Sequence, residues 1–420
     1  MNREELYAIF FNQQKDFEEE DPTIDREMAK KAIDLISIDM PIIITGLRRC
    51  GKSFLLKIIK ERLKLNEKEY FYVDFNDERL VKFELGDFQK IIDFINEHGY
   101  KEKCFLFIDE IQEVTGWEKW IDRVKGKYKI FITGSNSKLL SSEFSTILTG
   151  RAVSLGLTPL NFREFLQANK VNLKDWRLDL KEHSILRKEL KSFIRMGGIP
   201  KRITTGQDIV VKELYNDILY KDIVARFGKL DKQIKEIALF FFSNPASLVS
   251  LRAISKLVQL KNIATIKAIV EAFENSFLFF FVSKFDYSIK TQIQNPRKIY
   301  CIDNGFLVNI GFRLSEDKGR LLENLVAIEL KRREKEIFYY SDKYECDFLI
   351  REGNKIKEAI QVSYELNEKN KEREVGGLLD ALKKFKLKMG IILTYDQDDE
   401  FKIENKTIKV IPAWKWLLSG

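Results

Sequence analysis

The stretch PIIITGLRRCGKSFLLKIIK, residues 41–60, decides the fold of this chain. Its first part is apolar and predicts a buried strand over residues 42–45, and its last part has the spacing of an amphipathic helix. Between them stands G-x-x-x-x-G-K-S, which begins at Gly46 and ends at Ser53. Strand, glycine-rich loop and helix in this order favour a phosphate-binding loop over a chance glycine-rich turn.

Each fixed position of this loop has a chemical role toward a phosphate. Glycines permit backbone angles that turn consecutive N–H groups toward one point, and the helix N-terminus adds partial positive charge. Lys52 can reach the β- and γ-phosphates of ATP, and the Ser53 hydroxyl can ligate Mg²⁺. The predicted nucleotide-binding residues of the loop are Gly46, Leu47, Arg48, Arg49, Cys50, Gly51, Lys52, Ser53 and Phe54. We expect the two arginine side chains to point away, because the backbone forms the cradle.

A second motif, FLFIDE at residues 105–110, supplies two carboxylates at the end of a predicted strand. Asp109 can hold the Mg²⁺ shell, as a Walker-B aspartate does. Glu110 can polarise the attacking water as a general base. The alternative is a strand end capped by two solvated acids.

Polar residues at two further positions are candidates for the same site. Ser135 or Asn136, at the tip of the next predicted strand, could orient the water or contact the γ-phosphate, although ordinary turn chemistry explains them too. Arg151 could act as an arginine finger, in cis or from a neighbouring subunit. The alternative for Arg151 is a surface arginine.

Apolar runs alternate with helical patterns over residues 1–157, which predicts an α/β fold with a mostly parallel sheet. Because ligands bind at the carboxyl ends of such strands, the polar strand ends should meet at the loop. Residues 158–230 predict a helical lid, and residues 231–312 follow a winged-helix-like pattern. Residues 313–420 predict a small α/β domain of one long helix and short strands.

The composition is that of a globular chain: 45% hydrophobic and 32% charged residues. No apolar run reaches the length of about 18 residues that a membrane span needs, and the acidic N-terminus does not predict a signal peptide. Four scattered cysteines without a C-x-x-C pair predict neither a zinc site nor a disulfide framework, and we expect a cytoplasmic location. The net charge of +8 fits either nucleic-acid contact or a solvated basic surface.

The motifs GLRRCGKS, FLFIDEIQEVTGWEKWI and IFITGSNSKLLSSEFSTILTGRAVSLGLTPLNFREF resemble those of predicted AAA+-superfamily ATPases of archaea and bacteria. These carry a C-terminal domain of unknown function that resembles PD-(D/E)XK nucleases. The GGIP break at residues 197–200 and the stretch 319–395 match as well, so the resemblance covers nearly the whole chain. It implies a P-loop NTPase core of the AAA+/ASCE type that hydrolyses ATP with Mg²⁺. It also implies a sensor at Ser135 or Asn136 and a finger at Arg151.

The nuclease resemblance directs attention to three positions of the C-terminal region. Glu323 lies on the predicted long helix, and Asp347 lies in ECDFLI. Where the nuclease pattern has E-x-K, which holds Mg²⁺ and positions water, this chain has Gln361-Val-Ser363. The metal site is therefore expected to be incomplete, which favours a degenerate nuclease-like fold used for binding over an active nuclease.

The winged-helix-like pattern offers a candidate DNA contact. Asn262 could cap the second helix, whose first turns would face the major groove. The available polar residues are Lys261, Thr265 and Lys267 on the helix, and Lys290 and Arg297 in the wing. The alternative is a module that only packs against the ATPase.

Three functions stay open from the sequence. The first is an ATP-driven switch that acts on DNA or on a protein partner, as a monomer or an oligomer. The second is a DNA nuclease gated by ATP, against which the missing E-x-K pair argues. The third is a regulatory scaffold that binds ATP with little turnover, against which Glu110 argues.

Overall fold

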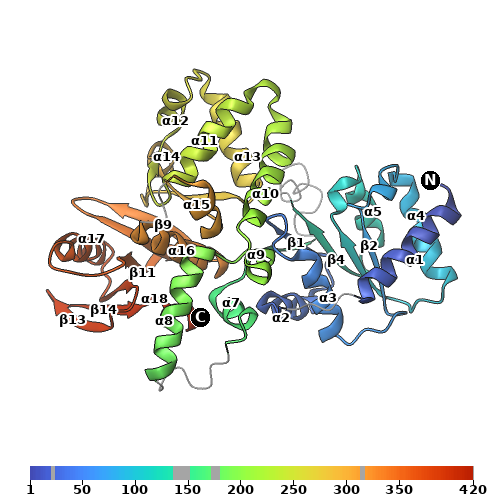
Figure 1. The fold of residues 1–420 in the computed structure, drawn as a ribbon, viewed down its shortest axis with the longest axis horizontal. Helices are drawn as coiled ribbons and strands as arrows, with labels where there is room; N and C mark the ends of the chain where they lie inside the picture. Colours follow the sequence, from blue (N-terminus) through green and yellow to red (C-terminus); the bar gives the residue numbers. More distant parts are fainter. Residues whose placement is uncertain (20–23, 136–151, 172–179, 313–316, 420) are drawn as a thin grey trace. The chain divides into compact units, whose positions relative to one another are not determined.

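Five parallel strands form the core of the N-terminal unit, Met1–Thr158 (Figure 1). The computed structural model describes residues 1–19, 24–135, 152–171, 180–312 and 317–419. The strand order is β2-β3-β4-β1-β5, so the strand that precedes the glycine-rich loop lies between two neighbours and is buried along its length. The strands are β1 (Ile42–Gly46), β2 (Tyr70–Asp74), β3 (Phe105–Asp109), β4 (Lys129–Gly134) and β5 (Val153–Leu157). The predicted α/β class with a parallel sheet is confirmed.

Helices and short 3-10 turns connect these strands. An aromatic core fills the space between the sheet and α1, where Phe10 packs edge-on against Phe71 and Phe94. The α-helices are α1 (Arg3–Glu19), α2 (Glu27–Asp34), α3 (Lys52–Arg62), α4 (Phe88–Glu97) and α5 (Trp117–Val124), and the 3-10 turns are η1 (Leu35–Ile38), η2 (Glu78–Leu80), η3 (Leu85–Asp87) and η4 (Ile111–Glu113).

The second unit, Pro159–Gly420, begins with helices. The GGIP break separates α8 from α9: Gly197 has a φ of 73°, and a Cβ on Gly198 would lie 2.2 Å from the carbonyl oxygen of Leu160. These elements are α7 (Phe162–Ala168), α8 (Leu180–Met196), α9 (Pro200–Thr205), α10 (Ile209–Asp217), a π-helical turn η6 (Ile218–Ile223), and 3-10 turns η7 (Val224–Arg226) and η8 (Gly228–Leu230).

A three-stranded sheet with the order β6-β8-β7 follows, built on three helices. The chain order is helix, strand, helix, helix, strand, helix, strand, so a short helix stands between the last two strands, where the sequence predicted a hairpin, and the winged-helix-like pattern stays a prediction. Asn262 caps α13 by accepting hydrogen bonds from the N–H groups of Ala264 and Thr265. The elements are α11 (Asp231–Ser243), β6 (Leu248–Val249), α12 (Leu251–Leu257), α13 (Ile263–Asn275), β7 (Phe279–Val282), α14 (Ile289–Gln294), β8 (Arg297–Cys301) and α15 (Asn304–Ile310).

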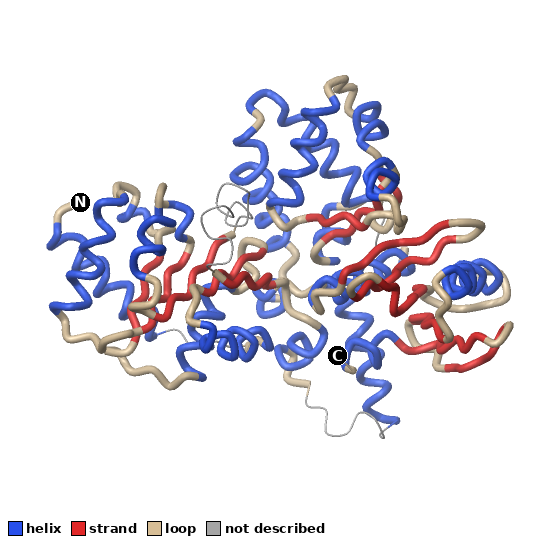
Figure 2. Tube along the Cα trace, turned by 180° about the vertical axis from the view of Figure 1, so that it is seen from behind, coloured by secondary structure: helices blue, strands red, loops and turns tan. Residues whose placement is uncertain are grey.

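The C-terminal region contains a six-stranded mixed sheet with the strand order β13-β14-β12-β11-β10-β9. Its strands are drawn in red in Figure 2. Strand β12 pairs in parallel with β11 and β14, and the other pairs are antiparallel. The elements are α16 (Lys318–Arg332), β9 (Glu336–Ser341), β10 (Glu345–Glu352), β11 (Lys355–Val362), α17 (Lys371–Lys384), β12 (Met389–Thr394), β13 (Asp399–Ile403), β14 (Lys406–Pro412) and α18 (Ala413–Leu418). Within the described ranges, no helix has the length and hydropathy needed to cross a membrane.

Candidate nucleotide site

The glycine-rich loop runs from the end of β1 to the first residue of α3, which is Lys52. Gly51 precedes the helix with a φ of 98°, and Arg49 has a φ of 57°, so the loop contains two left-handed residues. Gly46 is required for a different reason: a Cβ there would lie 2.2 Å from the carbonyl oxygen of Leu157 on β5. The two glycines therefore serve the turn and the packing of the loop on the sheet, respectively.

Arg26 forms hydrogen bonds to the backbone of the glycine-rich loop, a role that the sequence did not indicate. Its buried guanidinium donates hydrogen bonds to the carbonyl of Cys50 at 2.8 Å and to that of Thr158 at 2.6 Å. The side chain of Arg49 is exposed and that of Arg48 is half-buried. Arg26 thus ties the loop to the end of β5 through backbone groups.

Lys52 is folded back over the loop. Its Nζ donates to the carbonyls of Gly46 at 3.4 Å and Leu47 at 3.2 Å, and lies 3.4 Å from a carboxylate oxygen of Glu110. The side chain is 4% exposed, which places the ammonium inside the loop instead of in solvent.

Asp109 is buried at the tip of β3 and accepts three side-chain hydrogen bonds. The donors are Ser53 of α3, the hydroxyl of Tyr72 on β2 at 3.2 Å, and the hydroxyl of Thr133 on β4. Burial and the neighbouring charge of Glu110 raise the pKa of Asp109. A cation at this position would relieve both effects, because it would favour the charged carboxylate.

Glu110 occupies a strained position immediately after β3, with a φ of 48°. Non-glycine residues in the left-handed region are uncommon and cluster at functional sites. Its Oε2 accepts hydrogen bonds from the N–H of Ser135 at 3.2 Å, from the Ser135 hydroxyl at 2.9 Å, and from Gln112. Burial alone would raise the pKa of Glu110, but Lys52 and the hydrogen bonds from Gln112 and Ser135 lower it. The group is therefore ionised at neutral pH, as a general base must be.

Asp74 is a third carboxylate at this edge that sequence reasoning missed. It ends β2 and stands in register with Asp109 on β3. Burial and the charge of Asp109 raise its pKa to about 7. The stretch YFYVD at residues 70–74 ends in an aspartate, as FLFID does, and this polar strand end could have identified Asp74. However, no second acid follows it, so it does not match the Asp-Glu motif.

Thr133 links the two acids of the FLFIDE motif. Its hydroxyl donates to Asp109 and accepts a hydrogen bond from the N–H of Glu110 at 3.1 Å. Asn136 and Arg151 lie outside the described residues, so their predicted roles stay predictions.

The residues at this edge fit a nucleotide with Mg²⁺. A hydroxyl and carboxylates are the oxygen ligands that Mg²⁺ prefers, and it commonly takes one or two from the protein and the rest from phosphates and water. In the part of the chain that the structure describes, no three Asp, Glu, His or Cys side chains form a ready metal cage.

The candidate DNA-binding residues of the winged-helix-like region are partly engaged within it. Arg297 lies 3.5 Å from Glu274, and its guanidinium lies 4.5 Å from the centre of the Phe281 ring. Lys267 forms a pair with Glu271 one turn along α13. These contacts fit packing at least as well as DNA contact.

The residues named by the nuclease resemblance are also brought together. Glu323 and Asp347 approach each other around Lys298 of β8. Gln361 accepts a hydrogen bond from the N–H of Asp347 at 3.2 Å, whereas the Ser363 hydroxyl donates to the carbonyl of Glu365 at 3.0 Å. Lys298 was not expected at this site.

Three family models match the chain. Residues 39–166 match an AAA domain, residues 187–317 a domain of unknown function (DUF8612), and residues 318–416 another (DUF4143). The uncharacterized protein MJ1544 of Methanocaldococcus jannaschii is 36% identical, with 94% of this chain and 93% of that protein covered. An uncharacterized protein of Haemophilus influenzae is 30% identical, with 93% and 97% covered.

Solved structures with detectable similarity include two proteins in complex with ligands. AMPPCP-bound DnaA from Aquifex aeolicus is 19% identical, with a TM-score of 0.26, and the match covers 59% of this chain and 86% of that chain. The Aeropyrum pernix ORC1 protein in complex with DNA is 11% identical, with a TM-score of 0.34 and coverage of 72% and 94%.

Proposed function

We propose that this chain, which belongs to the same family as MJ1544 of Methanocaldococcus jannaschii and matches an AAA domain over residues 39–166, binds ATP with Mg²⁺ and hydrolyses it. One observation carries the proposal. Lys52 forms an ion pair with Glu110, and Ser53 donates a hydrogen bond to Asp109 at the carboxyl edge of the sheet. Thr133 joins the two pairs through its bonds to Asp109 and Glu110. Two separate sequence motifs thus meet where a parallel sheet binds ligands.

Each residue of this set has a distinct role in the proposal. Mg²⁺ would neutralise charge on the phosphates, held by the Ser53 hydroxyl and Asp109. Lys52 would leave the loop carbonyls and Glu110 for phosphate oxygens. Glu110 would then be free of its counter-charge and, held by Ser135, would accept a proton from the attacking water.

Turnover would be used to move the regions appended to the AAA domain. A switch requires ATP turnover, whereas a scaffold would bind ATP with little turnover. The ionised Glu110, which accepts a hydrogen bond from Ser135, supports the switch. Asn136 as sensor and Arg151 as finger complete the proposal. The partner on which the motion acts is DNA or a protein.

ATP hydrolysis by the full chain tests the site. Glu110→Gln should keep nucleotide binding and lower kcat by about 10²-fold or more, because the general base is lost. Lys52→Ala should weaken nucleotide binding itself. Glu113→Gln, which removes an exposed acid of η4, serves as a matched control and should leave both quantities unchanged. Wild-type turnover in Glu110→Gln would refute the assignment.

The same assay separates the two classes of partner. If the partner is DNA, duplex DNA should raise the ATPase rate, and binding should weaken steeply with salt. Lys261→Glu with Lys267→Glu should then abolish the stimulation. No stimulation and no salt-dependent binding would leave a protein partner.

A further inference from the structure

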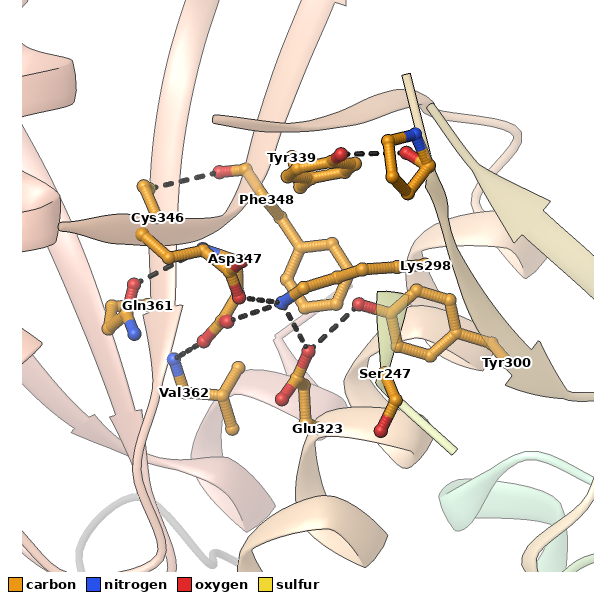
Figure 3. A network of polar contacts seen from close by, with 12 residues as sticks. Ser247, Lys298, Tyr300, Glu323, Tyr339, Cys346, Asp347, Phe348, Gln361 and Val362 are labelled. Carbon is orange, nitrogen blue, oxygen red and sulfur yellow. Dashed lines mark hydrogen bonds and ion pairs between the residues drawn. The ribbon is translucent and has the colours of Figure 1, made fainter. Parts of the chain in front are cut away.

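Lys298 places a buried ammonium among three carboxylates (Figure 3). Its Nζ lies 2.7 Å from Glu345, 2.9 Å from Glu323 and 2.9 Å from Asp347. The side chain of Lys298 is 2% exposed. An ammonium has three donors, so this arrangement uses one for each carboxylate.

The carboxylates are fixed by further hydrogen bonds. The Tyr300 hydroxyl donates to Glu323 at 2.8 Å, and the N–H of Val362 donates to Asp347 at 2.9 Å. Burial alone would lower the pKa of Lys298, but Asp347 and Glu323 raise it well above its ordinary value. The ammonium is therefore charged throughout the neutral range.

A nuclease-like domain would hold Mg²⁺ between Glu323 and Asp347, and the residues here do not fit that ion. Gln361 replaces an acid, and its amide donates to Glu374 at 2.7 Å. The Lys298 ammonium is within hydrogen-bond distance of both carboxylates, so it takes the space and charge that a divalent ion would need. The cluster faces a cavity of about 890 Å³, so access does not exclude the metal.

We propose that Lys298 is a built-in cation that replaces the divalent metal of this domain. The carboxylate cluster is then a structural joint between β8 and the C-terminal sheet, and not a metal-dependent nuclease centre. This inference concerns the second unit alone and does not depend on the ATPase proposal.

Backbone contacts near Lys298 support the role of a joint. The N–H of Tyr339 on β9 donates to the carbonyl of Ser283 at 3.0 Å, and the N–H of Phe285 donates back to Tyr339 at 2.8 Å. The Tyr339 hydroxyl donates to the carbonyl of Pro296 at 2.7 Å, two residues before Lys298. Tyr339 of the C-terminal sheet is thus hydrogen-bonded to both ends of the segment that connects β7 to β8.

Manganese binding by the full-length protein tests the proposal. Asp109→Asn serves as the background, without nucleotide, so that the AAA site does not contribute. Electron paramagnetic resonance should detect no saturable Mn²⁺ in this background. Adding Lys298→Met should create one Mn²⁺ site and make the thermal midpoint rise with Mn²⁺, and adding Asp347→Asn should remove both effects. Lys343→Met, which removes another lysine that lines the cavity, should create no site.

Two results of the manganese experiment would overturn the proposal. One is saturable Mn²⁺ binding in the Asp109→Asn background that disappears with Asp347→Asn, because the metal and Lys298 would then coexist. The other is absence of any Mn²⁺ effect in folded Lys298→Met.

A stability measurement keeps the test decisive if Lys298→Met folds poorly. That variant leaves three carboxylates without their shared counter-charge, which is strongly destabilising in a buried site. Adding Glu323→Gln should recover part of the lost thermal stability. No recovery would show that Lys298 does not act as the counter-charge and would equally overturn the proposal.

Discussion

Asp74 places a carboxyl group beside Asp109 at the edge where we propose Mg²⁺ binds, and a bound cation would favour its charged form. Asp74→Asn should raise the Mg²⁺ concentration needed for half-maximal ATP hydrolysis by about 3- to 10-fold, because a nearby carboxylate stabilises a divalent cation. The KM for ATP at saturating Mg²⁺ should change little. Titration of Mg²⁺ at fixed ATP measures the effect, and an unchanged Mg²⁺ requirement would place Asp74 outside the metal's environment.

Asp77, three residues further on, has the opposite electrostatic setting. Hydrogen bonds from Arg79 lower the pKa of Asp77 to about 2. Burial acts in the opposite direction, and a hydrogen bond from Gln13 lowers the pKa further. An acid with a lowered pKa contributes stability above its ordinary pKa of 3.8 and loses that stability as the pH falls toward 2. Asp77→Asn should therefore lower the free energy of unfolding at pH 7 by about 1 kcal/mol, discounted for solvent screening. Denaturant unfolding from pH 7 to pH 3 should show the difference shrinking, and a constant difference would contradict this origin.

At the residue scale, sequence reasoning located groups that belong to a contiguous motif and missed those that do not. Lys52 and Asp109 were found because fixed spacing and flanking strands identify them. Arg26 and Thr133 reach the same site from other elements, and nothing in their local sequence indicates which backbone groups they contact. Lys298 was missed for the same reason, because its carboxylate partners are distant in the sequence.

Between elements, Arg26 connects the start of α2 to the glycine-rich loop and the end of β5. Arg26→Met should lower the free energy of unfolding by about 2–3 kcal/mol, because two hydrogen bonds from a charged donor are lost. It should also weaken binding of an ATP analogue, since the loop loses its support. Arg62→Met, which breaks a partly exposed pair with Asp25, is the control and should cost less than about 1 kcal/mol. Equal effects of the two variants would argue against a specific role of Arg26.

The conformation of the GGIP break at residues 197–200 also depends on a contact with another element of the fold. Gly198 lies against the backbone of Leu160, and the N–H of Leu160 donates to the Gly198 carbonyl at 2.8 Å. Gly198→Ala should therefore destabilise the second unit by about 3 kcal/mol, because the backbone must shift to admit the methyl group. Gly319→Ala places a methyl in the first turn of α16 at an ordinary contact distance of 3.6 Å and should be neutral. Thermal unfolding of the two variants makes the comparison, and equal midpoints would contradict the predicted clash.

At the element scale, apolar periodicity predicted the parallel sheet and most helices, because those elements are long and their buried faces are regular. The β13–β14 hairpin was not predicted. Strand β13 is largely exposed and reads DEFKI, which lacks a buried apolar run. Its position depends on pairing with β14, a contact that local pattern does not encode.

At the scale of the whole molecule, the division into four regions stays a prediction, and the structure groups residues 159–420 into one unit. Phe285, from the loop after β7, packs in the core of the C-terminal sheet with Phe338. Such long-range contacts join regions that differ in local pattern. The boundary near Thr158 is the division that separates the AAA sheet from the rest.

Two units with separate cores should unfold in two transitions, and a nucleotide should move only one of them. In scanning calorimetry of the wild type, a non-hydrolysable ATP analogue with Mg²⁺ at about 100 times its Kd should stabilise the N-terminal unit by about 3 kcal/mol. The second transition should stay in place, and Gly198→Ala should identify it by lowering it alone. Lys52→Ala should abolish the nucleotide shift without affecting the second transition. A single transition that moves as a whole with nucleotide would instead show that the units unfold together, so that binding energy at the glycine-rich loop already reaches the C-terminal region before any hydrolysis.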